Sequence, residues 1–253
     1  MRFSWAALAW VLLSAIPTFA ATDPQALLAG PRQAIQQADY RASGHLVRVD
    51  ANGARTSDDI SIKARWFPGV LRILVDITAP ADARSRILLE MRPSGQDSVH
   101  VARPGDKALA VIPFEKWVDG PLGPGFSYED FLEQQFFWSG QAALEAVRRG
   151  ARDCDVLKST PGATDKSHYA EVRTWLDHTI DFPVYVEKTL RAGGAVKQFT
   201  YFDLRKDGGV YSATQIEEKT VGQSGSTLLI INRGSPKANL NLGDFSPERI
   251  THF

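Results

Sequence analysis

Residues 59–77 read DISIKARWFPGVLRILVDI, and they contain two apolar runs joined by a tight turn. Proline presets the backbone at Pro68 and glycine tolerates the positive φ that follows at Gly69, so the chain should reverse there. Apolar and polar side chains alternate in the first run, which predicts a strand with one buried face and one wet face. Its apolar set is Ile60, Ile62, Ala64 and Trp66, and the returning antiparallel strand carries Leu71, Ile73, Val75 and Ile77.

The same period of two recurs along most of the chain, which predicts a mainly β protein. Further strands are expected near 41–50, 85–92, 97–103, 108–113, 152–159, 168–177, 182–191, 195–204, 210–220 and 225–233. Short glycine-containing turns separate most of them, so sequential strands should pair as hairpins in a meander. A sheet of that many strands needs closure or a cover, and the few helical segments, including Pro24 to Ala38, are the expected cover.

Residues 1–20 have the pattern of an export signal. Arg2 precedes an apolar run from Trp5 to Ile16, which is too short to span a bilayer, and a small residue, Ala20, stands before the expected cut. We therefore expect a cleaved signal peptide over 1–20 and one domain over 21–253. No later stretch is apolar and long enough to be expected as an anchor.

Charge and cysteine content narrow the classes of function. The chain has 29 basic and 29 acidic side chains, and this balance produces no field that would attract nucleic acid. The single cysteine, Cys154, cannot form an internal disulfide, and neighbouring carboxylates argue against a reactive thiolate, so it is expected to be buried and structural.

Motifs for catalysis and for cofactors are missing from the sequence. The five histidines form no HExxH pattern, and neither a nucleophile elbow nor a phosphate-binding glycine loop is present. We expect His168 and His178 to be solvated, because neighbours such as Glu171 and Asp177 point to other faces of a strand. The acidic pairs are expected to have local roles: Asp58-Asp59 opens a strand, and Glu129-Asp130 follows Ser127 as the N-cap of a short helix. No enzymatic activity, metal or cofactor is predicted.

Aromatic side chains are concentrated between residues 114 and 138, where the meander is interrupted. They are Phe114, Trp117, Phe126, Tyr128, Phe131, Phe136, Phe137 and Trp138. Two interpretations fit this density: an ordinary core beneath a fixed cover, or a movable lid over an apolar space that admits an acyl chain. The sequence alone does not separate a filled core from one that can be filled.

Residues 126–130, FSYED, resemble a characteristic run of the exported bacterial outer-membrane lipoprotein-sorting proteins of the LolA-like group. The likeness continues through GARDCDVL at 150–157, WLD at 175–177, FPV at 182–184, KQFT at 197–200 and FSPERI at 245–250. It covers roughly residues 60 to 253. Two departures are the LGPG run at 122–125, in place of the group's usual approach to the motif, and a poorly matching segment at 134–150.

The resemblance implies a strongly curved antiparallel half-barrel of about ten or eleven strands, with a few short helices as a lid over its apolar concave face. It also implies a periplasmic carrier that binds lipid or lipoprotein acyl chains for transfer toward the outer membrane. The partner that it implies is a membrane-bound donor or acceptor protein. The residues expected to line the cavity are Ile60, Ile62, Trp66, Leu71, Ile73 and Val75, and those expected to gate it are Phe126, Tyr128 and Phe131.

Two other classes of function stay open. The same half-barrel with a permanently filled core would serve as a periplasmic scaffold or sensor that docks another protein without lipid transfer. A hydrolase is the weakest alternative, since a β protein can assemble a catalytic site from distant strands. Co-purifying lipid would distinguish a carrier from a scaffold.

Overall fold

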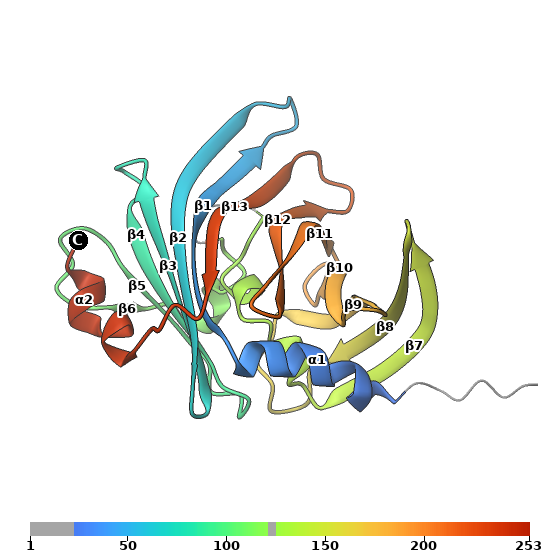
Figure 1. Cartoon of the computed structure of the whole chain (residues 1–253). Helices are drawn as coiled ribbons and strands as arrows, with labels where there is room; N and C mark the ends of the chain where they lie inside the picture. The colour runs from blue at the N-terminus through green and yellow to red at the C-terminus, as the bar shows by residue number, and fades with distance from the viewer. Residues whose placement is uncertain (1–22, 121–124) are drawn as a thin grey trace, which may run out of the picture.

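The computed structural model describes residues 23–120 and 125–253, which form one open antiparallel sheet of thirteen strands with two α-helices (Figure 1). The predicted signal peptide and the start of the LGPG run lie outside these residues. A mainly β architecture with a curved sheet was predicted correctly. The predicted count of ten or eleven strands was too low.

The elements have the following bounds. The α-helices are α1 (Pro24–Gln36) and α2 (Pro247–Thr251), and the 3₁₀ turns are η1 (Phe114–Lys116), η2 (Glu129–Phe131), η3 (Gln134–Phe136) and η4 (Leu242–Phe245). The strands are β1 (Asp39–Val49), β2 (Arg55–Phe67), β3 (Val70–Ala79), β4 (Ser85–Met91), β5 (Ser98–Ala102), β6 (Ala110–Val111), β7 (Gly140–Arg149), β8 (Arg152–Thr160), β9 (Tyr169–Asp177), β10 (Phe182–Leu190), β11 (Val196–Asp207), β12 (Val210–Thr220) and β13 (Ser226–Pro236).

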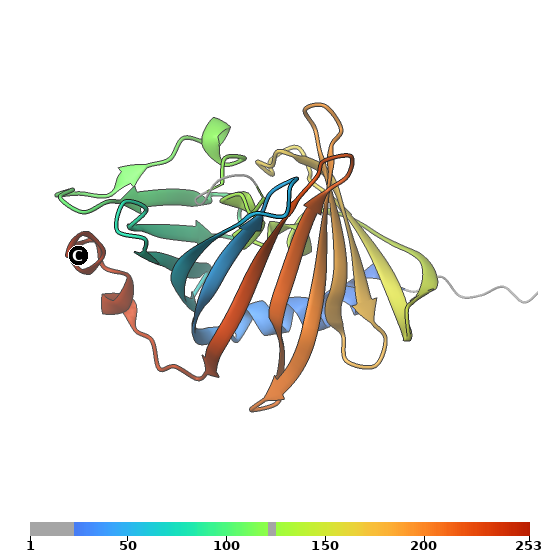
Figure 2. The ribbon, with the colours of Figure 1, turned by 90° about the horizontal axis from the view of Figure 1, so that it is seen from above.

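The strand order is that of a meander broken once, at its middle. The chain starts in β1 at the centre of the sheet, moves outward strand by strand to the edge at β6, and then crosses to the opposite edge at β7. From β7 it returns strand by strand to β13, which pairs with β1. Figure 2 shows the fan of strands from above, open between its two edges.

The hairpin of residues 59–77 forms as predicted. Gly69 adopts a φ of +79°, which glycine tolerates without the steric cost of a side chain. Phe67 pairs with Val70 and Ile62 with Val75, so the alternating apolar sets of the two strands share a face. The pattern therefore fixed both the turn and the register.

Strand β7 is the one that the sequence pattern failed to predict. Its residues QAALEA at 141–146 are good helix formers, and most of its side chains are exposed. Its pairing with β8 is also interrupted by a register shift between Leu144 and Val147. An edge strand with one irregular partner shows little alternation in its sequence.

Helix α1 was predicted to within two residues at its C-terminal end. Asp23 caps it, with its carboxylate accepting a hydrogen bond from Gln25 N at 2.9 Å, and Pro24 follows in the first turn. Leu28 and Ile35 are buried where the helix packs against β7, β8 and β10. The helix therefore covers one half of the sheet, as Figure 1 shows. Neither α1 nor α2, within the described ranges, has the length and apolar composition needed to span a membrane.

The C-terminal segment covers the opposite, outer face of β3 to β5. It forms a second apolar cluster that is separate from the main core and consists of Leu74, Leu88, Ala102, Leu240, Phe245 and Ile250. Arg86 holds the end of the segment, because its Nη1 donates to the carbonyl oxygens of Arg249 at 3.1 Å and His252 at 2.6 Å. Leu74 on the outer face of β3 is buried because this segment covers it.

Candidate functional site

All nine residues predicted to line or gate a cavity lie in one apolar cluster on the inner face of the sheet. Six of them are buried: Ile60, Leu71, Ile73, Val75, Phe126 and Tyr128. The other three, Ile62, Trp66 and Phe131, are partly buried against the same cluster. The predicted lining residues on β2 and β3 and the predicted gating residues thus belong to the same core cluster. Their role in binding a ligand stays a prediction.

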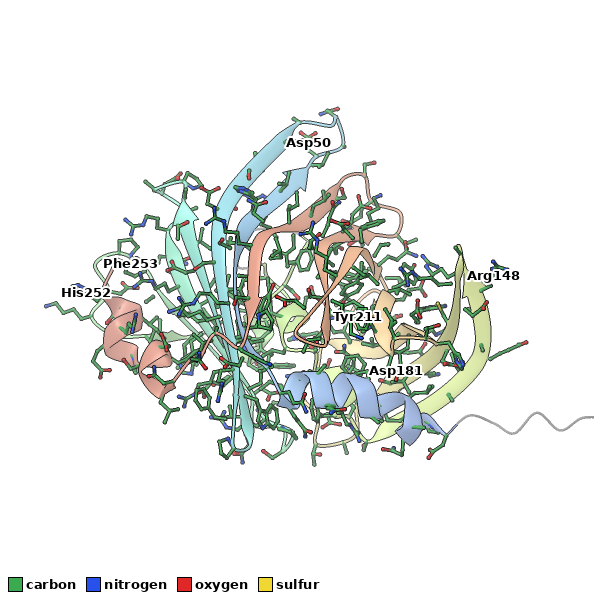
Figure 3. The ribbon with its side chains drawn as sticks, viewed as in Figure 1. Asp50, Arg148, Asp181, Tyr211, His252 and Phe253 are labelled. Atoms are coloured by element: carbon green, nitrogen blue, oxygen red, sulfur yellow. The ribbon has the colours of Figure 1, made fainter. Side chains whose placement is uncertain are left out.

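Residues 125–138, here called the cover segment, lie across the inner face between the two halves of the sheet. The Phe126 ring packs 5.8 Å from Phe131 and 5.5 Å, edge to face, from Phe199 on β11. Figure 3 shows side chains throughout the space between sheet and α1. The cover segment is therefore part of the apolar core in this structure.

Gly125 brings the cover segment against β13. A Cβ atom there would lie 2.1 Å from Thr227 Oγ1, and the φ of +116° also disfavours any other residue. Two of the cavities that border the described elements differ in place and size, and neither of these two is a large apolar hollow under the cover. One of about 10 Å³ lies beside Gln134 and Trp138, and one of about 300 Å³ lies on the outer face, among charged side chains near Asp244.

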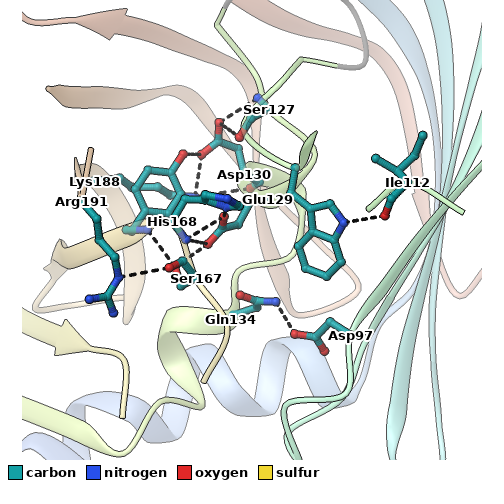
Figure 4. Close-up of polar contacts among 12 residues, drawn as sticks. Asp97, Ile112, Ser127, Glu129, Asp130, Gln134, Ser167, His168, Lys188 and Arg191 are labelled. Atoms are coloured by element: carbon teal, nitrogen blue, oxygen red, sulfur yellow. Dashed lines mark hydrogen bonds and ion pairs between the residues drawn. The ribbon is translucent and has the colours of Figure 1, made fainter. Parts of the chain in front are cut away.

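Asp130 in the cover segment is the centre of a buried polar network (Figure 4). Tyr169 on β9 donates its hydroxyl to Asp130 Oδ1 at 2.6 Å, and Lys188 Nζ on β10 lies 3.1 Å from the same oxygen. Lys197 Nζ on β11 pairs with Asp130 Oδ2, which also accepts two hydrogen bonds of 2.8 Å from Ser127. One carboxylate thus ties the cover segment to three neighbouring strands.

The environment decides the protonation states in this network. Burial alone would raise the pKa of Asp130, but the ammonium groups of Lys197 and Lys188 hold it well below its usual value. Burial and the Asp130 carboxylate raise the pKa of Tyr169 well above its usual value, so Tyr169 remains a hydrogen-bond donor. The network therefore holds an ionised carboxylate between two cations.

Glu129 anchors the cover segment at a second point. Its carboxylate accepts a hydrogen bond from the Ser167 hydroxyl, and two more from His168, through the backbone N–H at 3.2 Å and Nδ1 at 2.9 Å. The His168 ring also stacks on Phe114, with 4.0 Å between centroids. The expectation that His168 is solvated was wrong, because it precedes β9 and lies beneath the aromatic segment. His178 is exposed as predicted.

The local roles predicted for the acidic pairs were wrong in two respects. Residues 129–131 form only a 3₁₀ turn, its N-cap is Tyr128, and Ser127 donates to Asp130 instead of capping a helix. Asp58 and Asp59 lie inside β2, not at its start. Cys154 is buried and unpaired, as predicted, and burial raises the pKa of its thiol.

A signal for the Asp130 network exists in the sequence, in the strand patterns. Lys188 follows Val184 and Val186 at an inward-facing position, and Lys197 precedes Phe199 in the same way. Buried lysines need an anionic partner. The alternation thus points to a carboxylate from elsewhere in the chain, although it does not say which one.

Asp97 and Gln134 join the end of the cover segment to the β4–β5 turn, since Gln134 Nε2 donates to Asp97 Oδ2 (Figure 4). Burial raises the pKa of Asp97 to about 6. In the unfolded chain an aspartate titrates near about 3.9, so the folded state binds this proton more tightly. The Asp97 carboxylate therefore lowers the free energy of unfolding above pH 6. This loss of stability disappears as the pH falls toward about 4 and the carboxylate takes up a proton.

We expect the wild type to gain on the order of 2 kcal/mol in unfolding free energy relative to Asp97→Asn between pH 7 and pH 4. The measurement is urea unfolding of both proteins at several pH values. Only the difference between the two pH curves is used, because Asp97→Asn also changes a hydrogen bond. Parallel curves would contradict the assignment.

Within residues 23–120 and 125–253, no group of three or more histidine, cysteine, aspartate or glutamate side chains is arranged to hold a metal ion.

Three comparisons place the chain among known proteins. The model of a family described as "Uncharacterized protein" matches residues 70–252, and no curated protein matches the chain. A domain assigned to outer-membrane lipoprotein sorting from Vibrio parahaemolyticus has a similar structure, with a TM-score of 0.78 and 20% identity. The match covers 88% of this chain and 97% of the Vibrio chain.

Two other solved structures are similar over the same extent. A DUF1329 family protein from Desulfovibrio piger has a TM-score of 0.78 at 15% identity, over 89% of this chain and 98% of its own. A LolA superfamily protein from Nitrosomonas europaea has a TM-score of 0.64 at 16% identity, again over 89% and 98%. At these identities the likeness shows a shared fold.

Proposed function

Because this chain belongs to the family whose model matches residues 70–252, and shares its fold with a lipoprotein-sorting domain and a LolA superfamily protein, we propose that it is a periplasmic carrier of lipid or of lipoprotein acyl chains. The carried chain would lie on the inner face of the sheet, beneath the cover segment, and pass toward the outer membrane. One observation supports this most: strands β2 and β3 and the aromatic cover meet in one apolar cluster.

The proposed mechanism is an exchange of one apolar surface for another. Burying an acyl chain gains about 25 cal/mol for each Å² removed from water, so a carrier needs no polar chemistry to hold its cargo. The aromatic rings of the cover already occupy the same surface, with Phe126 packed on Phe199. The net free energy of binding is then the free energy gained by burying the acyl chain minus the free energy needed to displace the cover. This smaller net value permits release to an acceptor.

Two observations support the proposed periplasmic location. The sequence predicts a cleaved signal peptide over residues 1–20, and the Vibrio domain of the same fold is described as an outer-membrane lipoprotein-sorting domain. A membrane-bound donor or acceptor protein would complete the transfer.

Phe131→Asp is expected to weaken binding of a fluorescent fatty acid by at least about tenfold, because it places a charge on the surface that would contact the acyl chain. The measurement is a fluorescence titration, with displacement by candidate lipids. Leu144→Asp is the matched control, since Leu144 is an exposed leucine on β7. Unchanged binding in a folded Phe131→Asp protein would refute the site.

The scaffold or sensor function is the second candidate. The observation that favours it is the filled inner face, because the cover's own side chains occupy it. Native mass spectrometry of the protein purified from cells would decide between the two. Co-purifying lipid supports a carrier, whereas a ligand-free protein that takes up no lipid supports a scaffold.

A further inference from the structure

Lys188 on β10 and Lys197 on β11 are direct register partners, and both side chains point into the core. Their side chains are only 6% and 9% exposed. Lys188 Nζ lies 5.0 Å from the centroid of the Phe199 ring, and Lys197 Nζ lies 5.6 Å from it. Like charges at opposed positions of two strands repel each other, so this pair requires an anion.

In this structure the anion is the carboxylate of Asp130, whose side chain is completely buried. Two other acids face the same pair. Glu218 on β12 lies near Lys197, and Glu133 in the cover segment lies near Lys188. Burial raises the pKa of both, whereas the two lysines hold the pKa of Asp130 well below its usual value. Tyr169 completes the site as a hydrogen-bond donor.

The lysines and the carboxylate lie on different elements, which would move apart in the proposed exchange. Lys188, Lys197 and Glu218 are on the sheet, whereas Asp130 is on the cover segment with Phe126 and Phe131. Displacing the cover would therefore remove Asp130 and leave two cations with one acid. At least one net positive charge would remain in an apolar surface, which is costly unless a new anion replaces Asp130.

Resting on the carrier function proposed above, we propose that Lys188 and Lys197 form a head-group site for an amphiphile with a single negative charge, and that Asp130 fills this site while the cover is in place. The segment combines apolar rings with a nearby carboxylate. A ligand of the same chemistry has an acyl chain next to a carboxylate or a phosphodiester. The site thus selects the head group, and the β2–β3 surface accepts the chain.

The test compares a fluorescent fatty acid with its methyl ester, which has the same chain and no charge, at pH 8 on the purified protein. The wild type is expected to bind the acid at least about tenfold more tightly than the ester. Lys188→Met should reduce affinity for the acid about tenfold and leave the ester within about twofold. Asp130→Asn should raise the ratio of acid to ester affinity, because it removes the internal competitor.

The double variant Asp130→Asn/Lys188→Met is the control for misfolding of the single variants, because it removes one anion and one cation together. It should retain ester binding while its acid-to-ester ratio falls to about one. Equal binding of acid and ester by the wild type, or a ratio unchanged in the double variant, would overturn the head-group site and leave the carrier function standing. Failure of both probes to bind would instead reject the carrier function.

Millimolar acetate and inorganic phosphate form the last arm, because a free anion carries the same charge without a chain. Neither is expected to displace the fatty acid. Displacement as effective as that by unlabelled fatty acid would overturn the assignment of an amphiphile, since the lysines would then recognise a free anion.

Discussion

Asp130→Asn is expected to lower the free energy of unfolding by about 3–5 kcal/mol, because it leaves two buried lysines without their ionised partner. The asparagine keeps the size of the side chain, so the loss reports charge and hydrogen bonding. It also weakens the acceptor for Tyr169 and Ser127. The measurement is urea unfolding near neutral pH, where the carboxylate of Asp130 is ionised in both folded and unfolded states.

Asp203→Asn is the matched control. Asp203 also pairs with a cation, Arg205 at 3.2 Å, but both side chains are 66% exposed. Solvent-exposed pairs contribute about 0–1 kcal/mol, so this change should have little effect. Adding Lys188→Met to Asp130→Asn should recover part of the lost stability, because it removes one unpaired cation. Equal stability of Asp130→Asn and Asp203→Asn would contradict the central place of Asp130.

Phe136→Ala and Phe245→Ala should each cost about 3–5 kcal/mol, since both rings are almost fully buried. They differ in location: Phe136 is in the cover segment, and Phe245 is in the cluster on the outer face. Under the proposed function, only Phe136→Ala should change fatty-acid binding, and it should raise the affinity by making apolar space beneath the cover. The measurements are urea unfolding and probe titration of both variants.

The pair also separates fold stability from binding. A loss of stability with unchanged binding is expected for Phe245→Ala. If both variants changed probe affinity equally, the binding effect would reflect general loosening of the fold, and the inner-face site would lose its support.

The sequence predicted what depends on short-range pattern. Alternation and the Pro68-Gly69 turn defined the β2–β3 hairpin and its register, and the apolar sets of this hairpin lie together on the inner face. Strand β7 escaped because it is exposed and has a helix-forming composition. The outer cluster was not predicted either, because it depends on where the C-terminal segment returns to the sheet.

The candidate site was predicted in its apolar part and missed in its polar part. Phe126 and Tyr128 were chosen because aromatic density marks a cover. The assignment of Asp130 failed because a carboxylate near a turn normally has a local role. Its actual partners, Lys188 and Lys197, are 58 and 67 residues away in the chain. Only the fold brings them together.

The pairing of β1 with β13 has a consequence for the folding rate. Leu46 lies opposite Leu229, so the middle of the sheet joins segments that are 183 residues apart in the chain. The loss of chain entropy on closing so long a loop must occur before the contacts between these strands can stabilise the fold. Folding is therefore slow. Within each half of the meander, neighbouring strands can pair as soon as they are synthesised. The pairing of β1 with β13, which joins the two halves, forms only after β13 has left the ribosome. Until then, the edges of β1 and of the growing second half remain unpaired and open to aggregation.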